Sequence, residues 1–458
     1  PRLAGILFLL ALIGFGTKAG VMPMHVWLPE AHPAAPSHVS AIMSGVMIKT
    51  GIYGLVRGLT FMGAPPAWWG WLLIAAGLVS GILGVLFAIA QHDLKRLLAY
   101  HSVENIGIIV MGLGLGLLGQ SLHNTPLMIL GFAGGLLHVF NHALFKGLLF
   151  LTAGAVLHAC GTREIDHLGG LLKRMPWTGI SFLVGAAAIS GLPPFNGFVS
   201  EFLIYYGALR GAISSHAGMV IPFLAVIAGL ALIGGLAVAC FVKAFGIIFL
   251  GEPRSPRAQS ASEVGFSMKG PSFLLAALCL LFGLAPAAGF YLVAPAASQL
   301  VETAGDAAMS SLTDVSSVLS NIAMASGIFV VLLLLVMITR FLLGRAKSVE
   351  QTGTWDCGYA QPTPRMQYTA SSFAQPLTYL FRSLLRIHHR FSPPSGFFPS
   401  AASFKTESTD VVQEKIYRPL IDLAGQWLPR LRRIQEGRVQ LYVLYVAITL
   451  LVLLVWGQ

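Results

Sequence analysis

Long apolar runs separated by short polar connections make up most of this chain. A helix needs about 20 mostly apolar residues to cross a bilayer. Ten segments meet this requirement, and inside them the apolar residues do not alternate with polar ones as they do in soluble helices and strands. The pattern predicts an all-α polytopic membrane protein. The predicted spans are residues 3–24, 37–62, 67–91, 96–119, 126–158, 178–210, 220–250, 272–295, 317–343 and 439–457.

The composition excludes an ordinary soluble domain. Of the 458 residues, 55% are hydrophobic and 10% are charged, and the mean hydropathy is +0.76, whereas soluble domains carry about 25% charged residues. The four cysteines lie far apart and form no CxxC pair. This spacing argues against an iron–sulfur cluster or structural zinc site within the chain. The cysteines are Cys160, Cys240, Cys279 and Cys357.

Basic residues are distributed unequally between the two sides of the predicted bundle. The net charge is +11, and membrane proteins concentrate Lys and Arg in their cytoplasmic connections. If the first span runs from outside to inside, the outer connections contain only Arg57 and Arg210. Both termini are then predicted outside and the 344–438 segment inside, so the basic excess needs no nucleic acid to explain it. The inner connections contain Lys95, Arg96, Arg163, Lys173, Arg174, Arg254, Arg257 and Lys269.

The 344–438 segment is the only long stretch that resembles soluble sequence. Residues 373–391 place apolar side chains on one helical face and basic ones largely on another, which predicts an amphipathic helix along the membrane or a partner. The alternative is a solvated connecting helix. Residues 392–400, SPPSGFFPS, predict an irregular linker.

Several ionisable residues lie inside the predicted spans, and five of them stand out. A charged group near the bilayer centre costs about 2.5–3.5 kcal/mol on insertion scales, so such groups usually face the bundle interior and mark ion or proton routes. Here they are Lys18, Lys49, Lys146, Glu201 and Lys243.

Two of these charges lie beside predicted helix breaks. Lys18 precedes Pro23 in GFGTKAGVMP, and Glu201 follows Pro193 and Pro194 in GLPPFNGFVSE. Proline removes backbone hydrogen bonds, and a break at membrane depth is tolerated where it lines a cavity or hydrated path. The alternative for each is a proline kink with a snorkelling side chain.

Lys49 and Lys243 each lie in an apolar helix directly after a span that is broken and charged. The recurrence suggests a structural repeat. Chance similarity between apolar helices is the alternative.

The fifth predicted span carries His138, His142 and Lys146 at intervals of four residues, and therefore on about one helical face. Imidazole exchanges protons near neutral pH, so this ladder predicts a lateral proton relay. Two alternatives stay open: a histidine pair that ligates haem or metal, and polar core residues that only satisfy helix contacts.

Four stretches together resemble the proton-conducting, antiporter-like membrane subunits shared by respiratory complex I, cation/proton antiporters and membrane-bound hydrogenases. Within that family, AYHSVENIG and the stretch at 355–377 resemble the branch of hydrogenase-4 component B and formate hydrogenlyase subunit 3. The four stretches are residues 15–55, 93–109, 138–156 and 191–206.

The resemblance implies two inverted five-helix repeats, each with a broken helix, and a buried proton path. Lys18 then resembles the broken-helix lysine of the first repeat, and Lys49 the connecting lysine. His138, His142 and Lys146 resemble the central relay, and Glu201 the terminal group, as in complex I subunit M.

The carboxylate that pairs with the first lysine in the family has no counterpart here, so about six preceding helices are expected to be missing. The expected organisation is the end of the first repeat (1–62), the second repeat (63–250), additional helices (251–343), the cytoplasmic segment (344–438) and a final helix (439–458).

The expected function is that of a proton-translocating subunit, without a redox centre of its own, in a hydrogenase-4 or formate hydrogenlyase-like complex of the bacterial inner membrane. The resemblance implies partner membrane and peripheral subunits that carry iron–sulfur clusters and a nickel–iron centre. Alternatives are a Na⁺ or K⁺/H⁺ antiporter subunit, a membrane subunit of NADH-quinone oxidoreductase, and a purely structural anchor. The candidate proton-path residues are Lys18, Lys49, His138, His142, Lys146, Glu201 and Lys243.

Overall fold

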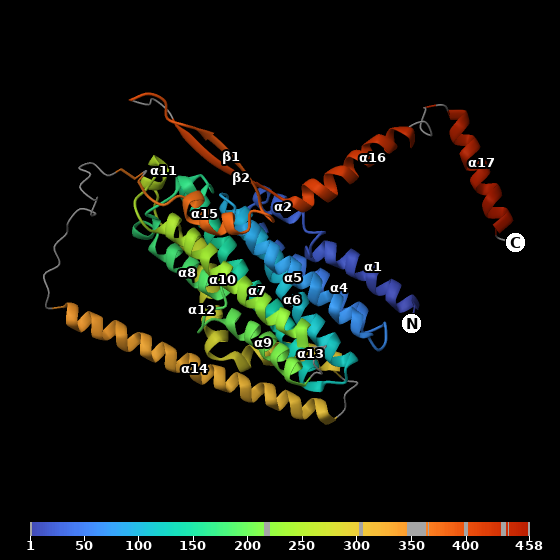
Figure 1. Ribbon diagram of the computed structural model, residues 1–458, viewed down its shortest axis with the longest axis horizontal. Coiled ribbons are helices and arrows are strands. Elements are labelled where there is room, and N and C mark those ends of the chain that lie inside the picture. The colour runs from blue at the N-terminus through green and yellow to red at the C-terminus, as the bar shows by residue number, and fades with distance from the viewer. Residues whose placement is uncertain are drawn as a thin grey trace. The chain divides into compact units, whose positions relative to one another are not determined.

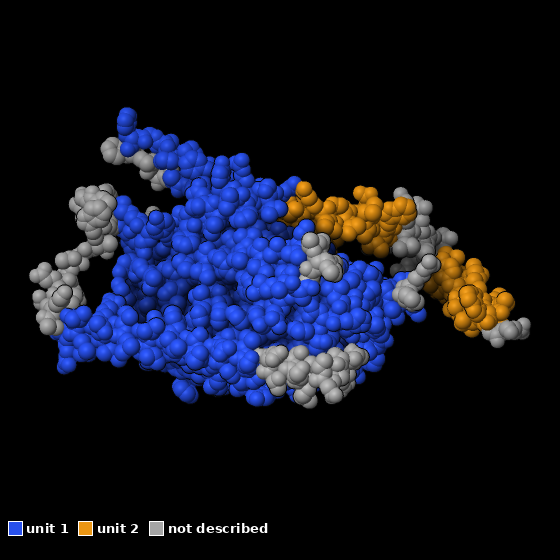
Figure 2. All heavy atoms as spheres, turned by 60° about the horizontal axis from the view of Figure 1, so that its bottom comes forward, with its two compact units in different colours: residues 1–408 blue, residues 409–458 orange. Residues whose placement is uncertain are grey.

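The chain forms two compact units in a computed structural model, residues 1–408 and 409–458 (Figure 2). The structure describes residues 2–214, 220–301, 306–345, 363–364, 366–397, 402–431, 437 and 439–456. In these ranges the chain is helical apart from one two-stranded sheet (Figure 1). The predicted all-α membrane architecture is confirmed, with this small sheet as an addition.

Eight helices of the described ranges are long and apolar enough to cross a membrane, and α1 and α8 are shorter apolar helices. The helices of the first unit are α1 (Arg2–Ala19), α2 (Leu28–Ala34), α3 (Ser37–Ile42), the π-helical turn η1 (Met43–Met47), α4 (Ile48–Leu59), α5 (Ala67–Ile89), α6 (Leu94–Ser121), α7 (Thr125–Cys160), α8 (Pro176–Ile189), α9 (Asn196–Ser214), α10 (Val220–Phe249), α11 (Pro256–Gln259), α12 (Phe266–Leu284), α13 (Pro286–Val301), α14 (Asp306–Gly344) and α15 (Ala370–Leu380). Short 3₁₀ turns cover Ile165–His167 and Leu171–Lys173.

Helix α6 is at the centre of the first unit, between α5 and α7 (Figure 1). Glycines let these helices approach closely: a methyl group built on Gly77 of α5 would lie 2.6 Å from the Gly107 carbonyl oxygen of α6. On the other side of α6, a methyl group on Gly112 would lie 2.8 Å from Gly135 Cα of α7. Small residues at helix contacts are the usual means of tight packing in membranes, and they hold the helices that carry the buried charges.

Both predicted helix breaks are present. Helix α1 ends one residue after Lys18, where Gly20 adopts a φ of +84°. Helix α8 ends at Ile189 and α9 begins at Asn196, so the chain is non-helical through Pro193 and Pro194. The predicted span 272–295 is also interrupted: α12 ends at Leu284 and α13 begins at Pro286, because proline is favoured at a helix start but not inside a helix.

The amphipathic helix predicted over 373–391 is wrong in its second half. Helix α15 ends at Leu380, and Arg386–Ser392 is strand β1, paired with β2 (Ser403–Thr409). In RIHHRFS, Ile387, His389 and Phe391 alternate with polar residues at period two, which favours a strand over a helix. The predicted linker joins the two strands, and its residues 398–400 lie outside the described residues.

The second unit contains the π-helical turn η6 (Gln413–Tyr417), α16 (Arg418–Leu431) and α17 (Val439–Trp456). Helix α17 is long and apolar enough to span a membrane and has no buried residues within the structure. It lies within the predicted final span, residues 439–457.

Candidate functional site

Lys49 lies at the start of α4, directly after the π-helical turn η1. Its side chain is 8% exposed. The Nζ atom lies 2.6 Å from Nδ1 of His142 on α7 and also donates to the Ser44 carbonyl oxygen within η1. The structure thus brings together two predicted site residues that are 93 positions apart in the sequence and lie on different helices.

The predicted ladder on α7 is buried along its whole length, since His138, His142 and Lys146 are all 0% exposed. Lys146 Nζ and His142 Nε2 have no hydrogen-bond partner among the described side chains and backbone. Lys146 Nζ lies 5.9 Å from the centre of the Phe150 ring. A buried polar atom without a partner is costly, so these two atoms call for an explanation other than packing.

His138 links the ladder to the helices on either side. Its Nε2 donates to Asn105 Oδ1 of α6 at 3.1 Å, and its Nδ1 lies 2.9 Å from Ser200 Oγ of α9. Ser200 immediately precedes Glu201. A hydrogen-bonded connection therefore runs from α6 through α7 to the start of α9.

Glu104 and His101 are members of this buried cluster that the sequence interpretation missed. Glu104 is 1% exposed, and its Oε2 is hydrogen-bonded to His101 Nδ1 and lies 3.5 Å from Asn105 Nδ2. Glu104 lies on α6, which packs against the ladder helix α7. The sequence carries a signal for it, since Glu104 is an acid within a predicted span.

Glu201 lies on the second turn of α9, beside the break that separates α8 from α9. A methyl group built on Gly191 would lie 2.6 Å from Glu201 Oε2, and Gly191 adopts a φ of +61°. Its side chain is 8% exposed. The Glu201 carboxylate therefore lies directly against the helix break that the sequence predicts.

Two predicted residues lie outside this connected set. Lys18 is exposed at the end of α1, and no described residue forms an ion pair with it. Lys243 is 1% exposed and donates to the carbonyl oxygens of Ile89 at 2.6 Å and Gln91 at 2.8 Å. It therefore binds the carboxyl end of α5, where a cation is favoured by the unpaired carbonyls and the helix dipole.

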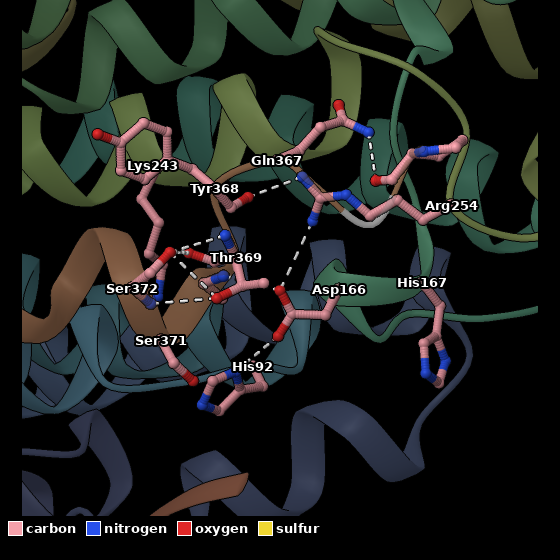
Figure 3. Close-up of polar contacts among 12 residues, drawn as sticks. His92, Asp166, His167, Lys243, Arg254, Gln367, Tyr368, Thr369, Ser371 and Ser372 are labelled. Carbon is pink, nitrogen blue, oxygen red and sulfur yellow. Dashed lines mark hydrogen bonds and ion pairs between the residues drawn. The ribbon is translucent and has the colours of Figure 1, made fainter. Parts of the chain in front are cut away.

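A second polar cluster lies next to this end of α5, at the predicted inner face, and is centred on Asp166 (Figure 3). Its Oδ2 lies 3.1 Å from His92 Nδ1, and its Oδ1 accepts from the Ala370 amide at 2.7 Å and lies 3.7 Å from Arg254 Nη1. Burial acts to raise the pKa of Asp166, but the bonds from His92 and Ala370 and the Arg254 charge together hold it below its usual value. His92 also bonds Thr406 of β2 at 2.8 Å, so the cluster fastens α15 and the hairpin to the bundle.

The chemistry available to these residues is proton exchange. Among the described residues, no three His, Cys, Asp or Glu side chains come together in a way that could hold a metal ion. The buried set instead contains two lysines, three histidines and two glutamates, joined in part by hydroxyl and amide groups. Such groups at hydrogen-bond distance can accept and donate protons in sequence. The buried set is Lys49, His101, Glu104, His138, His142, Lys146 and Glu201.

Comparison with known proteins identifies the family of the chain. Residues 3–229 match the family model described as NADH:quinone oxidoreductase/Mrp antiporter, transmembrane. Hydrogenase-4 component B of Escherichia coli (strain K12) is 40% identical over 476 residues, covering 99% of this chain and 69% of that protein. Formate hydrogenlyase subunit 3 of the same strain is 37% identical over 397 residues. The match covers 85% of this chain and 62% of formate hydrogenlyase subunit 3.

A solved structure shares the fold. A chain of the membrane-bound sulfane sulfur reductase, an archaeal respiratory membrane complex, superposes with a TM-score of 0.67 over 98% of this chain and 68% of that chain, at 23% identity. The predicted family resemblance is confirmed. The chain belongs to the NADH:quinone oxidoreductase/Mrp antiporter family of multi-pass membrane proteins.

Proposed function

We propose that the chain is a proton-translocating membrane subunit of a hydrogenase-4 or formate hydrogenlyase-like, complex I-related oxidoreductase assembly. The observation that carries the proposal is the direct contact between Lys49 and His142, 2.6 Å apart and both buried. Lys49 belongs to residues 1–62, which we expect to be the end of the first repeat. Its contact with His142 therefore connects that repeat to the histidine ladder of α7.

In the proposed path, Lys49 and His142 share a proton. From His142 the ladder extends along α7 in both directions, to His138 on one side and to Lys146 on the other. Lys146 exchanges its proton under the influence of the Glu104 charge, since Glu104 is buried on α6, the helix that packs against α7. His138 and Ser200 then connect the ladder to the start of α9. Glu201, beside the break, exchanges with one face of the membrane.

The coupling between steps is electrostatic. In a poorly screened interior, adding a charge to one member of the path changes the proton affinity of its neighbours by an amount that decays slowly with distance. Lys18 is exposed at the end of α1 and has no acidic partner among the described residues. We propose that a carboxylate outside this chain pairs with Lys18 and that this pairing sets the charge of Lys49.

The similarity to hydrogenase-4 component B supports a multi-subunit setting. We propose partner membrane subunits and peripheral subunits that carry the iron–sulfur clusters and a nickel–iron centre. The chain would lie in the bacterial inner membrane with residues 344–438 on the cytoplasmic side. The proposed domain organisation is that expected from the sequence, with the second repeat over 63–250.

Replacement of Lys49 by Met in the intact complex tests the proposal. Because the variant lacks an exchangeable proton at the contact with His142, we expect protons translocated per hydrogen evolved to fall by roughly tenfold or more. The measurement is acidification of inside-out vesicles alongside hydrogen production. Lys173→Met is the matched control, since Lys173 forms an exposed ion pair with Glu252 at 2.9 Å. Unchanged translocation in Lys49→Met, with the complex assembled, would contradict the proposal.

A second candidate function is cation/proton antiport, which the family description itself includes. The same buried lysines and glutamates could serve either role. Expression of the full-length protein alone in a strain that lacks Na⁺/H⁺ and K⁺/H⁺ antiporters separates the two. We expect no gain in salt tolerance; restored growth at high salt that Lys49→Met abolishes would favour the antiporter.

A further inference from the structure

Three helices enclose a groove on the face that the charge distribution predicts to be outer. The groove has a volume of about 230 Å³ and lies between the start of α7, the end of α9 and α14 near residues 315–318. Five of its eight lining residues are apolar, and Tyr206, Arg210 and Ser317 contribute polar groups. Ile129 and Leu130 of α7 are buried, and Val315 and Val318 line the opposite side from α14.

The groove also carries one positive charge. Arg210 of α9 lines it, and its guanidinium carbon lies 5.9 Å from the centre of the Tyr206 ring, one turn earlier on the same helix. Apart from residues 306–314, whose side chains the structure does not describe, no carboxylate of the described residues forms an ion pair with Arg210. A guanidinium of this kind presents a planar set of donors that matches a phosphate group.

The surroundings of the groove indicate the rest of the ligand. Farther along α14, Ile328, Val331 and Leu335 are 55%, 55% and 53% exposed. An apolar surface of this extent on a spanning helix faces acyl chains. The groove therefore has an aliphatic side, formed by Val315 and Val318 on the helix whose later part faces lipid. It also has a polar side, formed by Arg210 and Tyr206 near the end of α9, at the depth where the headgroups of a bilayer lie.

We propose that this groove binds one anionic phospholipid, with the phosphate on Arg210 and the upper part of an acyl chain against Val315 and Val318. The aliphatic walls select a lipid over a free anion, because a small hydrated anion gains nothing from them. The bound lipid fills the space between α14 and the α7–α9 pair.

The test uses the intact, detergent-purified complex titrated with phosphatidylglycerol, with bound lipid counted by native mass spectrometry. For Arg210→Ala we expect the affinity of one site per chain to fall roughly tenfold, as loss of a hydrogen bond to a charged group predicts. Arg57→Ala is the matched control. Arg57 is the other basic residue expected on the outer face, and its guanidinium lies over an aromatic ring, Phe61, at 4.8 Å, but it does not line the groove.

Two further arms distinguish the source and the location of binding. Excess inorganic phosphate should leave the bound phosphatidylglycerol in place. Val318→Trp, which narrows the groove but keeps Arg210, should also lower the occupancy of this site. The proposal would be overturned if Arg57→Ala and Arg210→Ala lost lipid affinity equally, or if Arg210→Ala kept it. Displacement of the bound phosphatidylglycerol by inorganic phosphate would also overturn it.

Discussion

At the scale of single residues, the buried charges depend on a few close approaches in the backbone. Gly191 is the clearest case, because its Cα hydrogen faces the Glu201 carboxylate and its φ is +61°. Any side chain at this position meets both a steric and a conformational barrier. The position of the Glu201 carboxylate thus depends on Gly191, a residue without a side chain.

Gly191→Ala should displace the Glu201 carboxylate, since the added methyl group would lie 2.6 Å from Oε2. Left-handed backbone in a non-glycine residue costs about 1–2 kcal/mol in addition. We expect proton translocation by the complex to fall while hydrogen evolution without a proton gradient is kept.

Gly161→Ala separates displacement from backbone strain. Gly161 has nearly the same φ, +64°, but caps α7 far from Glu201 in sequence, where a methyl group would meet the end of the flexible Arg257 side chain. This variant should lose only thermal stability. Equal losses of translocation in the two variants would show that strain alone is responsible.

The sequence reveals which charges are buried more readily than which of them meet, for a physical reason. Lys49 and the α7 ladder stand out because charge in an apolar span is costly wherever the span packs. Their contact does not stand out, because it depends on how η1 turns α4 towards α7. The same cost applies to Glu104, an acid within a predicted span.

At the scale of elements, long apolar helices were predictable and the segment after them was not. Hydropathy alone located the spans, and proline located the breaks between α8 and α9. The hairpin of β1 and β2 was missed because seven residues such as Arg386–Ser392 satisfy a helical pattern almost as well as an alternating one. The attachment of the hairpin by Asp166 involves residues from five separate segments, which no local pattern reveals.

Asp166→Asn should weaken that attachment. The neutral amide cannot form charge-assisted bonds with His92 and Arg254, and because the cluster is partly exposed we expect a loss of about 1 kcal/mol. Hydrogen exchange of the Ala370 amide should accelerate roughly fivefold. Glu252→Gln, which removes a nearby carboxylate that pairs with Lys173 instead, should leave this exchange unchanged.

The same cluster predicts a pH dependence with a definite sign. Because the pKa of Asp166 is lowered in the folded protein, its contribution is fully present above the usual carboxyl pKa of about 3.9 and is lost as the pH falls through the lower folded value. Protection of the Ala370 amide, corrected for intrinsic exchange, should therefore fall in acid for the wild type. Asp166→Asn should show no such step; a step of equal size in both proteins would assign it to another group.

At the scale of the whole molecule, the two kinds of charge occupy different places. Basic side chains lie mainly in the connections, and the buried set lies on the helices of the first unit. Lys18 is exposed at the end of α1, and the same helix exposes Leu3, Ile6 and Leu10. An apolar face of this kind on a spanning helix is suited to acyl chains or to the apolar face of another helix.

The π-helical turn Met43–Met47 has a consequence for the insertion and loss of residues. A π turn bonds residue i to i+5 and so contains one residue more than an α turn in the same length of axis. Because the extra residue is absorbed within one turn, its removal between Ile42 and Ile48 would restore a regular helix and leave the residues after it close to their present azimuth. Loss of one residue from the regular helix α3 would instead rotate everything after it by about 100° relative to what precedes it, and Lys49 would point away from His142. The π turn is thus a place where the chain can lose a residue and keep the contact between Lys49 and the ladder.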